Sequence, residues 1–451
     1  MDYIRKQFYT LKERILEPRK FMQVLAGPRQ VGKSTLVDQV LAQVDIPHTV
    51  EVADAVDPKD SDWIHRVWES ARITMRLRGI AEYLLVIDEV QKIENWSEVV
   101  KREWDADTRG RVNLKVVLLG SSRLLLRKGL TESLAGRYEL IRMPHWSLRE
   151  MQDAFGVSLD QYIYFGGYPG PAHLIQDERR WRKYIKDSLV APAIEKDVVM
   201  TSNIYKPALM KQLFELGCGY SAEILSLTKL MGQLQDAGNV TTLAGYLEIL
   251  NQCALLTGLQ KYAKDDARKR GSVPKYQVYN NALLTAYKGR SFVADRTDTQ
   301  AWGRWVESAV GAHLLSMAEE LDYEVYYWRE PARNKDEKDK EVDFVLVRDG
   351  EVTAIEVNRR TSEWRGQASL GYPERGGGNA KRNSGRRGMN AGLPAFVEAF
   401  HPKRSLALPS SDATRPSPGE LGRHSLLRRF VVGTGGVSLE DFLGSEVETL
   451  L

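Results

Sequence analysis

The segment from Gly27 to Thr35 has residue types and spacing suited to binding a phosphate chain. It reads GPRQVGKST, with glycines at the first and sixth positions and then a lysine and a serine. Glycines let backbone N–H groups turn inward around a phosphate, and a helix that starts there adds its positive dipole end. This spacing is typical of a P-loop, in which the lysine reaches the β- and γ-phosphates and the serine ligates Mg²⁺. We therefore predict phosphate contacts by the whole loop: Gly27, Pro28, Arg29, Gln30, Val31, Gly32, Lys33, Ser34 and Thr35.

Two adjacent acids, Asp88 and Glu89, end the apolar run YLLVIDEV. Carboxylates at the end of a buried strand are unfavourable unless a cation or hydrogen bonds compensate them. The pair lies 55 positions after Lys33 (88 minus 33). We expect Asp88 to hold Mg²⁺ through water and Glu89 to orient and polarise the attacking water. The pair extends the prediction from nucleotide binding to hydrolysis.

Further polar residues follow the next apolar run. NLKVVLLG ends in Ser121 and Ser122, whose hydroxyl groups can lie between the acid pair and the γ-phosphate. Arg137 comes just before the run YELIRM. Phosphoryl transfer is mostly electrostatic stabilisation, so an arginine that reaches the γ-phosphate of a neighbouring subunit is an expected part. The alternative is a surface arginine without a catalytic role.

A third set of acids lies further along the chain. Glu307 falls in a predicted helix, Asp343 in the predicted strand EVDFVLV, and Glu356 in the next, VTAIEVN. This order resembles the PD-(D/E)XK nucleases, and the resemblance implies Mg²⁺ between Asp343 and Glu356 with Glu307 nearby. Such nucleases carry a lysine where this chain has Asn358, although the lysine migrates to another element in some of them. An active nuclease, a nuclease-like fold used for binding, and carboxylates that merely face solvent all stay open.

The elements that position these residues follow from the apolar pattern. Residues 1–150 alternate buried strands with amphipathic helices, which predicts a parallel sheet covered on both faces. Residues 151–203 form a helical lid with the loop YFGGYPGP, and residues 204–290 contain three helices and a strand pair, which indicates a winged helix. The expected strands are FMQVLAG, HTVEVA, YLLVIDE, NLKVVLLG and YELIRM; the expected middle helices are PALMKQLFELGCG, AEILSLTKLMGQL and TTLAGYLEILNQCALL.

The last third of the chain has two different compositions. Residues 291–358 change from a helix to strands and form the nuclease-like α/β unit. Residues 359–425 are rich in Gly, Arg, Ser and Pro, which argues against a packed core. Order is expected to resume in residues 426–451, which we assign to the end of the nuclease-like unit.

The motifs GPRQVGKST, VIDEVQ, LLGSS and ESLAGR, in this order, resemble the AAA+ ATPases. More narrowly, they resemble a prokaryotic family in which such a core precedes a C-terminal domain of unknown function 4143. The resemblance covers roughly residues 15–358 and includes the runs at 120–137 and FGGYP at 165–169. It implies ATP as the nucleotide, a homo-oligomer, and these roles: ATP binding by Lys33, Ser34 and Thr35, Mg²⁺ and water handling by Asp88 and Glu89, sensing by Ser121 or Ser122, and an arginine finger at Arg137.

Composition and the distribution of charge indicate which kinds of binding partner to expect. The 451-residue chain has a net charge of +4 and 43% hydrophobic residues, as expected for a globular protein of two to four domains. Its longest apolar runs are strand-length and it has only two cysteines, so we expect no membrane partner and a cytoplasmic location. Basic runs at 179–186, 264–271 and 381–387 make DNA a candidate partner. The recognition-helix candidate TTLAGYLEILNQ has no Lys or Arg, so a structural or protein-binding role is an equal alternative.

The leading hypothesis from the sequence is an AAA+ ATPase that uses Mg²⁺ and moves its C-terminal domains. One alternative is an ATP-gated, Mg²⁺-dependent DNA nuclease. Another is a non-catalytic, nucleotide-dependent switch that binds a protein or DNA.

Overall fold

The computed structural model describes residues 3–120, 133–198, 204–235, 238–263, 271–332, 334, 337, 339–357, 428–432 and 439–444. Ser121, Ser122 and Asn358 lie outside these ranges, so the predictions made for them are not addressed by the structure. The same holds for basic residues 264–270 and 381–387. None of the described helices has both the length and the apolar character needed to cross a membrane.

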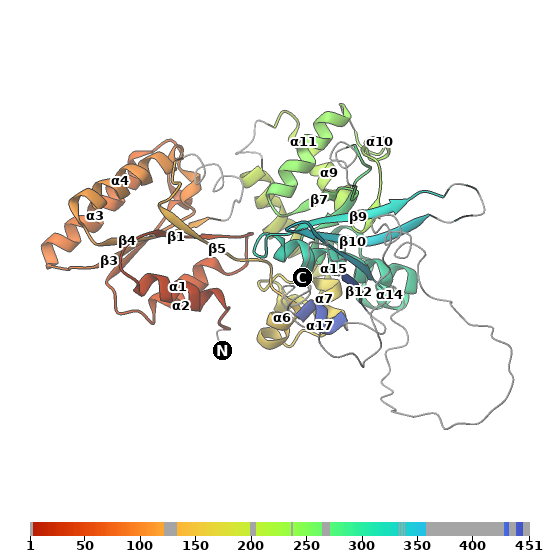
Figure 1. The fold of residues 1–451 in the computed structure, drawn as a ribbon, viewed down its shortest axis with the longest axis horizontal. Coiled ribbons are helices and arrows are strands. Elements are labelled where there is room, and N and C mark those ends of the chain that lie inside the picture. Colours follow the sequence, from red (N-terminus) through yellow and green to blue (C-terminus); the bar gives the residue numbers. More distant parts are fainter. Residues whose placement is uncertain are drawn as a thin grey trace, which may run out of the picture.

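A five-stranded parallel sheet with the order β2-β3-β4-β1-β5 organises the first domain (Figure 1). All five strands expected from the sequence are present. Helices α1 and α2 cover one face and α3 and α4 the other (Figure 1). The elements are α1 (Gln7–Leu16), β1 (Met22–Ala26), α2 (Lys33–Leu41), β2 (His48–Val52), α3 (Asp62–Arg78), β3 (Tyr83–Asp88), α4 (Trp96–Gly110), β4 (Leu114–Gly120) and β5 (Tyr138–Arg142).

Alternation along the central strands divides the core into two clusters. In β1, Leu25 packs with the α1 and α2 side, whereas Val24 packs with the α3 and α4 side. In β4, Val117 and Leu118 divide in the same way. Side chains point to opposite faces at successive strand positions, so a continuous apolar run is what a strand buried on both faces requires.

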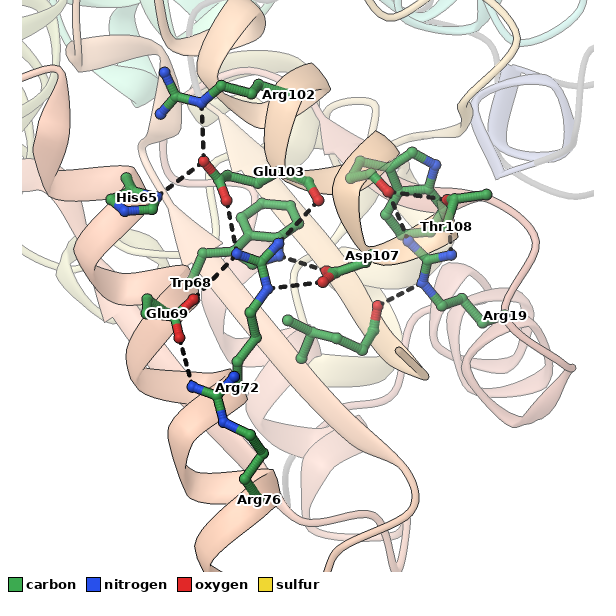
Figure 2. A network of polar contacts seen from close by, with 12 residues as sticks. Arg19, His65, Trp68, Glu69, Arg72, Arg76, Arg102, Glu103, Asp107 and Thr108 are labelled. Atoms are coloured by element: carbon green, nitrogen blue, oxygen red, sulfur yellow. Dashed lines mark hydrogen bonds and ion pairs between the residues drawn. The ribbon is translucent and has the colours of Figure 1, made fainter. Parts of the chain in front are cut away.

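A buried ionic network fixes α3 against α4 (Figure 2). Arg72 of α3 donates from Nε to Asp107 at 2.7 Å and from Nη1 to Glu103 at 2.8 Å. The indole of Trp68 donates to the other oxygen of Asp107 at 2.7 Å. Glu103 and Asp107 are at most 3% exposed, so these donors replace the water that each carboxylate loses on burial.

The lid begins with two short helices that carry complete capping boxes. The hydroxyl of Ser147 accepts from the N–H of Glu150, and that of Ser158 accepts from the N–H of Gln161. In return, the side chains of Glu150 and Gln161 accept from the backbone N–H of their caps. The next helix continues without a break into a π-helical segment, Tyr184–Val190. The lid contains α6 (Leu148–Phe155), α7 (Leu159–Phe165), α8 (Glu178–Lys183) and a second π-helical segment, Ala193–Val198.

Most of the elements predicted for residues 204–290 are present, but one predicted helix is wrong in its first part and another ends early. The expected helix over residues 222–234 is wrong in its first part, because Glu223–Ile224 is a strand that pairs with β8. Ala222 has a positive φ of 63°, which breaks the backbone out of a helix at that point. A later helix also ends at Gln252, earlier than predicted. The elements are α9 (Pro207–Gly219), β6 (Glu223–Ile224), α10 (Leu227–Met231), α11 (Val240–Gln252), β7 (Leu256–Leu259) and β8 (Lys275–Val278), with the sheet order β6-β8-β7.

The C-terminal region is a four-stranded sheet with the order β12-β11-β10-β9 beside the long helix α15 (Figure 1). Strands β9, β10 and β11 are antiparallel neighbours, and β12 joins β11 in parallel. Within the segment 426–451, residues 428–432 form β12 and residues 439–444 form α17. The elements are α13 (Asn281–Lys288), α14 (Phe292–Thr297), α15 (Thr299–Ala318), β9 (Glu324–Glu330), β10 (Lys340–Arg348), β11 (Glu351–Val357), β12 (Arg428–Val432) and α17 (Leu439–Gly444).

Candidate functional site

The predicted phosphate loop connects the end of β1 to the start of α2. Gln30 and Gly32 have positive φ values of 59° and 89°, so the chain between strand and helix is tightly curled. Gly27 lies against β5, and a Cβ atom at this position would stand 2.2 Å from the carbonyl oxygen of Met143. The first glycine is therefore required for close approach of two backbones, and the second for its left-handed conformation.

Lys33 lies inside this loop. Its side chain is 7% exposed, and its Nζ atom donates to the carbonyl oxygens of Gly27 at 3.0 Å and Pro28 at 2.8 Å. Backbone carbonyls are neutral acceptors, and a hydrogen bond of this kind contributes about 0.5–1.5 kcal/mol net. A phosphate is a stronger acceptor for the same ammonium because the bond becomes charge-assisted.

Ser34 and Asp88 meet at the mouth of the loop. The hydroxyl of Ser34 donates to Oδ2 of Asp88 at 2.7 Å, although the two residues belong to α2 and β3. The backbone N–H of Glu89 donates to the other oxygen of Asp88 at 2.8 Å. One hydroxyl and one carboxylate facing each other next to a phosphate-binding loop form an oxygen donor set that suits Mg²⁺.

Glu89 has a left-handed backbone conformation with φ of 55° and begins the turn after β3. The side-chain amide of Gln91 donates to its carboxylate. This amide was not singled out in the sequence, yet it holds the carboxylate that we expect to face the attacking water. The turn places Glu89 directly beside Asp88 at the C-terminal edge of the sheet, where the phosphate loop also lies.

Three residues that the sequence did not reveal support the loop from behind. The carbonyl oxygen of Val31 accepts from Arg5 at 3.3 Å and from the indole of Trp146 at 3.0 Å. The hydroxyl of Tyr184, in the π-helical part of the lid, donates to the side chain of Gln30 at 3.1 Å. Arg5 and Tyr184 are far from the loop in sequence and match no motif, so only tertiary structure identifies them.

The glycines of the FGGYP loop allow the lid to approach its neighbours closely. A Cβ atom on Gly166 would meet the side chain of Asn280 at 2.1 Å, and one on Gly167 would meet the carbonyl of Trp146 at 2.2 Å. The N–H of Gly167 also donates to Asn280 at 3.2 Å. The FGGYP loop thus packs the lid against the segment that precedes α13.

Arg137 lies at the opposite edge of the sheet from the phosphate loop. Its carbonyl accepts from the N–H of Met22, the first residue of β1, whereas the loop follows the last residue of that strand. Its guanidinium pairs with both oxygens of Asp105, at 2.8 and 3.0 Å, and is 31% exposed. This pairing lowers the pKa of Asp105 below its usual value. The full length of β1 separates Arg137 from the loop of its own chain, so it cannot contact a nucleotide bound there.

The second group of acids is a cluster that contains a lysine. Oxygen atoms of Glu307, Glu341 and Asp343 lie within 4.8 Å of one another. The Nζ atom of Lys275, on β8, lies 2.6 Å from Glu307, 3.2 Å from Glu341 and 3.8 Å from Asp343. Glu356, which was predicted with Glu307 and Asp343, is not part of this group of described carboxylates, and Glu341 joins it instead.

Lys275 occupies the position that a bridging metal ion would need. Mg²⁺ sits about 2.0–2.1 Å from its oxygen ligands, and the ammonium already contacts the oxygens that would supply them. Lys275 is 0% exposed and Glu307 is 1% exposed, so within this packing neither can turn to water and no phosphodiester can reach them. Burial alone would lower the pKa of Lys275, but Glu307, Asp343 and Glu341 outweigh it and raise that pKa above its usual value. In this structure a lysine ammonium lies among the carboxylates, and the second metal site expected at Glu307, Asp343 and Glu356 stays a prediction.

A cavity of about 360 Å³ separates the start of the phosphate loop from the end of α15. Gly27 and Pro28 line one side, and Leu315 and Glu319 line the other. Arg142 of β5 bridges it by an ion pair with Glu319 at 2.7 Å. The phosphate loop thus lies next to the interface with the C-terminal region.

Comparison with known proteins divides the chain into three matched stretches. Residues 19–152 match an AAA domain family, residues 157–293 match a domain of unknown function (DUF8612), and residues 302–367 match another domain of unknown function (DUF4143). The sheet, the loop and the first match confirm the prediction of an α/β, AAA-type P-loop ATPase domain in this part of the chain. The prediction of a DUF4143 region is confirmed by the third match.

Several known proteins are similar to parts of this chain. An uncharacterized protein of Mycobacterium tuberculosis is 25% identical over 342 residues, which cover 75% of this chain and 70% of the relative. An uncharacterized protein of Haemophilus influenzae is 21% identical and covers 58% of this chain and 68% of the relative. Among solved structures, a Walker-type ATPase of Pyrococcus abyssi aligns with a TM-score of 0.44 and 14% identity over 64% of this chain and 96% of that one. The Orc1 protein of Aeropyrum pernix in complex with DNA aligns with a TM-score of 0.33 and 14% identity over 65% and 95% of the two chains.

Proposed function

We propose that the protein is an AAA+ ATPase that hydrolyses ATP with Mg²⁺ and uses the reaction to move its C-terminal domains. The observation that carries this proposal is the meeting of Ser34 and Asp88, 2.7 Å apart, at a loop that already holds Lys33. These residues come from two different elements, and their side chains converge where a triphosphate and its metal would bind. An accidental P-loop spacing would not bring the acid of a separate strand to the same place.

Each residue has a distinct task in this proposal. Lys33 exchanges its two carbonyl acceptors for the β- and γ-phosphates, and the loop N–H groups wrap the β-phosphate. Bound Mg²⁺, held by Ser34 and Asp88, would neutralise charge on the β- and γ-phosphate oxygens. Glu89, held by Gln91, orients the attacking water and accepts its proton. Thr35, at the start of α2, contacts the α-phosphate in this proposal.

A neighbouring subunit supplies the remaining positive charge. Arg137 lies on the far edge of the sheet from its own loop, so it acts in a homo-oligomer on the nucleotide of the next copy. Its ion pair with Asp105 must open for this contact. An arginine in this role raises the rate by about 10³–10⁵ in other nucleotide hydrolases.

The lid and the C-terminal region receive the movement. Tyr184 of the lid touches Gln30 of the loop, and the Arg142–Glu319 pair joins β5 to α15, so both contacts lie next to the place where phosphate binds. We extend the proposal to the domain division: core 1–150, lid 151–203, winged helix 204–290, and nuclease-like unit 291–358 completed by 426–451. The β7–β8 hairpin after α11 supports the winged helix. The order of α15, β9, β10 and β11 supports the nuclease-like fold.

Metal-dependent DNA cleavage is not part of the proposal. The Lys275 ammonium stands among the carboxylates that would hold the metal, and Lys275, Glu307 and Asp343 are buried away from a phosphodiester. Position 358 lacks the lysine of such nucleases, and Lys275 on β8 is its counterpart near these acids. The ammonium of Lys275, however, occupies the space that the metal would need. The nuclease-like unit is therefore a structural or binding domain in this chain.

Phosphate release by the purified protein tests the proposal, together with binding of a fluorescent ATP analogue. Lys33→Ala should abolish analogue binding. Glu89→Gln should retain binding and lower phosphate release by about 10²–10⁴-fold, the usual contribution of a general base. Normal turnover by Glu89→Gln would contradict the assignment of Glu89. Binding without turnover by the unmodified protein would favour the nucleotide-dependent switch.

A further inference from the structure

A row of four basic side chains lines a hollow on the lid. Arg179, Arg182, Lys183 and Lys186 belong to one continuous helical stretch, α8 and the π-helical turns after it. Their spacing of i, i+3, i+4 and i+7 places them on one face of that stretch. The hollow has a volume of about 460 Å³, and all of its lining residues are charged: Glu178, Arg179, Arg182, Lys183, Lys186, Asp187 and Arg290.

The four cations of this row have no acidic partner within the part of the chain that the structure describes. The Nε atom of Arg182 is buried without any hydrogen-bond acceptor. Lys186 lies over the ring of Tyr287, 4.7 Å from its centroid, which leaves its charge uncompensated. Two acids, Glu178 and Asp187, also line the hollow and offset part of this charge, but the four cations of the row outnumber them. Both carboxylate oxygens of Glu178 accept from the N–H of Phe292, which holds this side chain in place.

Arg290 closes the other side of the hollow. Its own charge is compensated by Asp295 at 2.7 Å and Asp298 at 2.9 Å. Its carbonyl oxygen accepts from a terminal nitrogen of Arg182 at 3.1 Å, which orients this guanidinium at the hollow. A guanidinium prepared in this way suits a phosphate, which can accept from more than one of its N–H groups.

We propose that this hollow binds the phosphate backbone of a nucleic acid. From Arg179 to Lys186 the row is about 10 Å long at 1.5 Å per residue. Phosphates of one strand follow each other every 3.4 Å along a duplex, so the row can meet about three of them. The contact carries no sequence information, because it involves phosphates and not base edges.

The chemistry of the hollow favours a nucleic acid over an anionic membrane. A membrane-binding helix combines cations with an apolar face that enters the lipid, and no apolar side chain lines this hollow. The basic row also offers what α11 lacks, since α11 contains neither Lys nor Arg. The backbone contact therefore lies on the lid, outside the recognition-helix position of the winged helix.

This inference deepens the proposed function, because the basic row shares its helical stretch with Tyr184, which touches the phosphate loop. A nucleic acid held on this stretch can bias the lid and thereby the rate of hydrolysis. Binding to the hollow needs no nucleotide, however, so the two proposals can fail separately.

Fluorescence anisotropy of a labelled 30-base-pair duplex, measured with the full chain without nucleotide from 50 to 200 mM NaCl, tests the proposal. With three phosphates neutralised, log Kd against log salt should have a slope of about 2.7. Arg179→Glu/Lys183→Glu changes two exposed residues and should weaken binding at least tenfold and reduce the slope by about 2. Lys59→Glu/Arg78→Glu changes the net charge equally at two exposed positions of the first domain and should keep the affinity within about twofold.

Three results would overturn the proposal. The first is equal loss of affinity in both double variants, since the contact would then be a general charge effect. The second is retention of DNA affinity by Arg179→Glu/Lys183→Glu. The third is binding of polyglutamate or phosphatidylserine vesicles through the same residues with no DNA binding. Lys33→Ala, tested in parallel, should bind the duplex normally, which separates this result from failure of the ATPase proposal.

Discussion

Lys275→Met should convert the carboxylate–lysine cluster into a divalent-cation site. Methionine has a similar length and no charge, so the variant leaves Glu307, Glu341 and Asp343 together without their cation. Removing one partner of a buried ion pair costs about 3–5 kcal/mol of unfolding free energy. Because a domain has about 5–15 kcal/mol in total, we expect a large fall in the urea midpoint. Glu341→Gln removes the most exposed of the three acids, so it should lower the urea midpoint by less than Lys275→Met does.

Mn²⁺ should restore much of the stability lost by Lys275→Met, because it can take the place of the ammonium among the same oxygens. An ion present at 100 times its Kd stabilises the folded state by about 2.7 kcal/mol. The measurement is urea unfolding with and without Mn²⁺, in an Asp88→Asn background that weakens the site at the phosphate loop. Lys275→Met/Asp343→Asn should show less recovery, since it lacks a ligand.

The reasoning about this cluster fails on either of two results. If the protein that retains Lys275 gains stability from Mn²⁺, and Asp343→Asn removes the gain, the ammonium does not exclude a metal. If Lys275→Met unfolds at the same urea concentration as the unmodified protein, the cluster contributes no buried ion pairing. The raised pKa of Lys275 gives a further test. The stability that its charged ammonium adds to the folded state should be present at neutral pH and below, and it should be lost only as the pH rises above about 10.4, the usual pKa of lysine.

Four further predictions concern the first domain and the lid. Arg137→Ala and Lys33→Ala should each hydrolyse little ATP alone, whereas a mixture should recover activity, because one subunit supplies the loop and the other the arginine; no recovery would argue against action between subunits. Arg72→Met should lower the unfolding free energy by about 3–5 kcal/mol, since it strands two buried acids, and an unchanged urea midpoint would contradict this. Burial raises the pKa of Glu103, but hydrogen bonds from Arg72, His65 and Arg102 outweigh it and lower that pKa. Glu103 therefore stabilises the folded state above about pH 4.3, and this stabilisation is lost as the pH falls below that value. Urea midpoints from pH 7 to pH 3 should show the loss only when Arg72 is present. Tyr184→Phe should keep duplex affinity but reduce stimulation of phosphate release by DNA, and full stimulation would exclude this hydroxyl as the link.

The parts of this protein that the sequence predicted are those set by local pattern. All five strands of the first sheet, the loop and the acid pair follow from apolar runs and residue spacing. The strand Glu223–Ile224 was mistaken for helix because its pairing with β8 brings together residues about 50 positions apart. Local propensity contains no information on such a partner. The supports given by Arg5, Trp146 and Tyr184 were missed for the same reason.

Only some residues of the carboxylate cluster could be predicted from the sequence. Glu341 and Asp343 alternate on one strand, so they share a face, and period-two reasoning could have added Glu341. Lys275 could not be found in this way, because it lies on a different sheet. A lysine that begins a fully buried strand is nevertheless a rare feature, since lysine is almost never buried unless it is paired. Such a position is a reason to look for acids elsewhere in the chain.

Two of the buried lysines, Lys33 and Lys275, differ in how readily their hydrogen-bond partners can be exchanged. Lys33 donates to two neutral carbonyls of its own loop, bonds worth about 0.5–1.5 kcal/mol each, so an incoming triphosphate offers a better partner. Lys275 lies among three carboxylates, and removing it from them costs about 3–5 kcal/mol. A phosphate would also bring negative charge into a cluster that already has an excess of it. The first ammonium is therefore available for catalysis, whereas the second holds β8 to α15 and β10 and closes a site that would otherwise attract a metal.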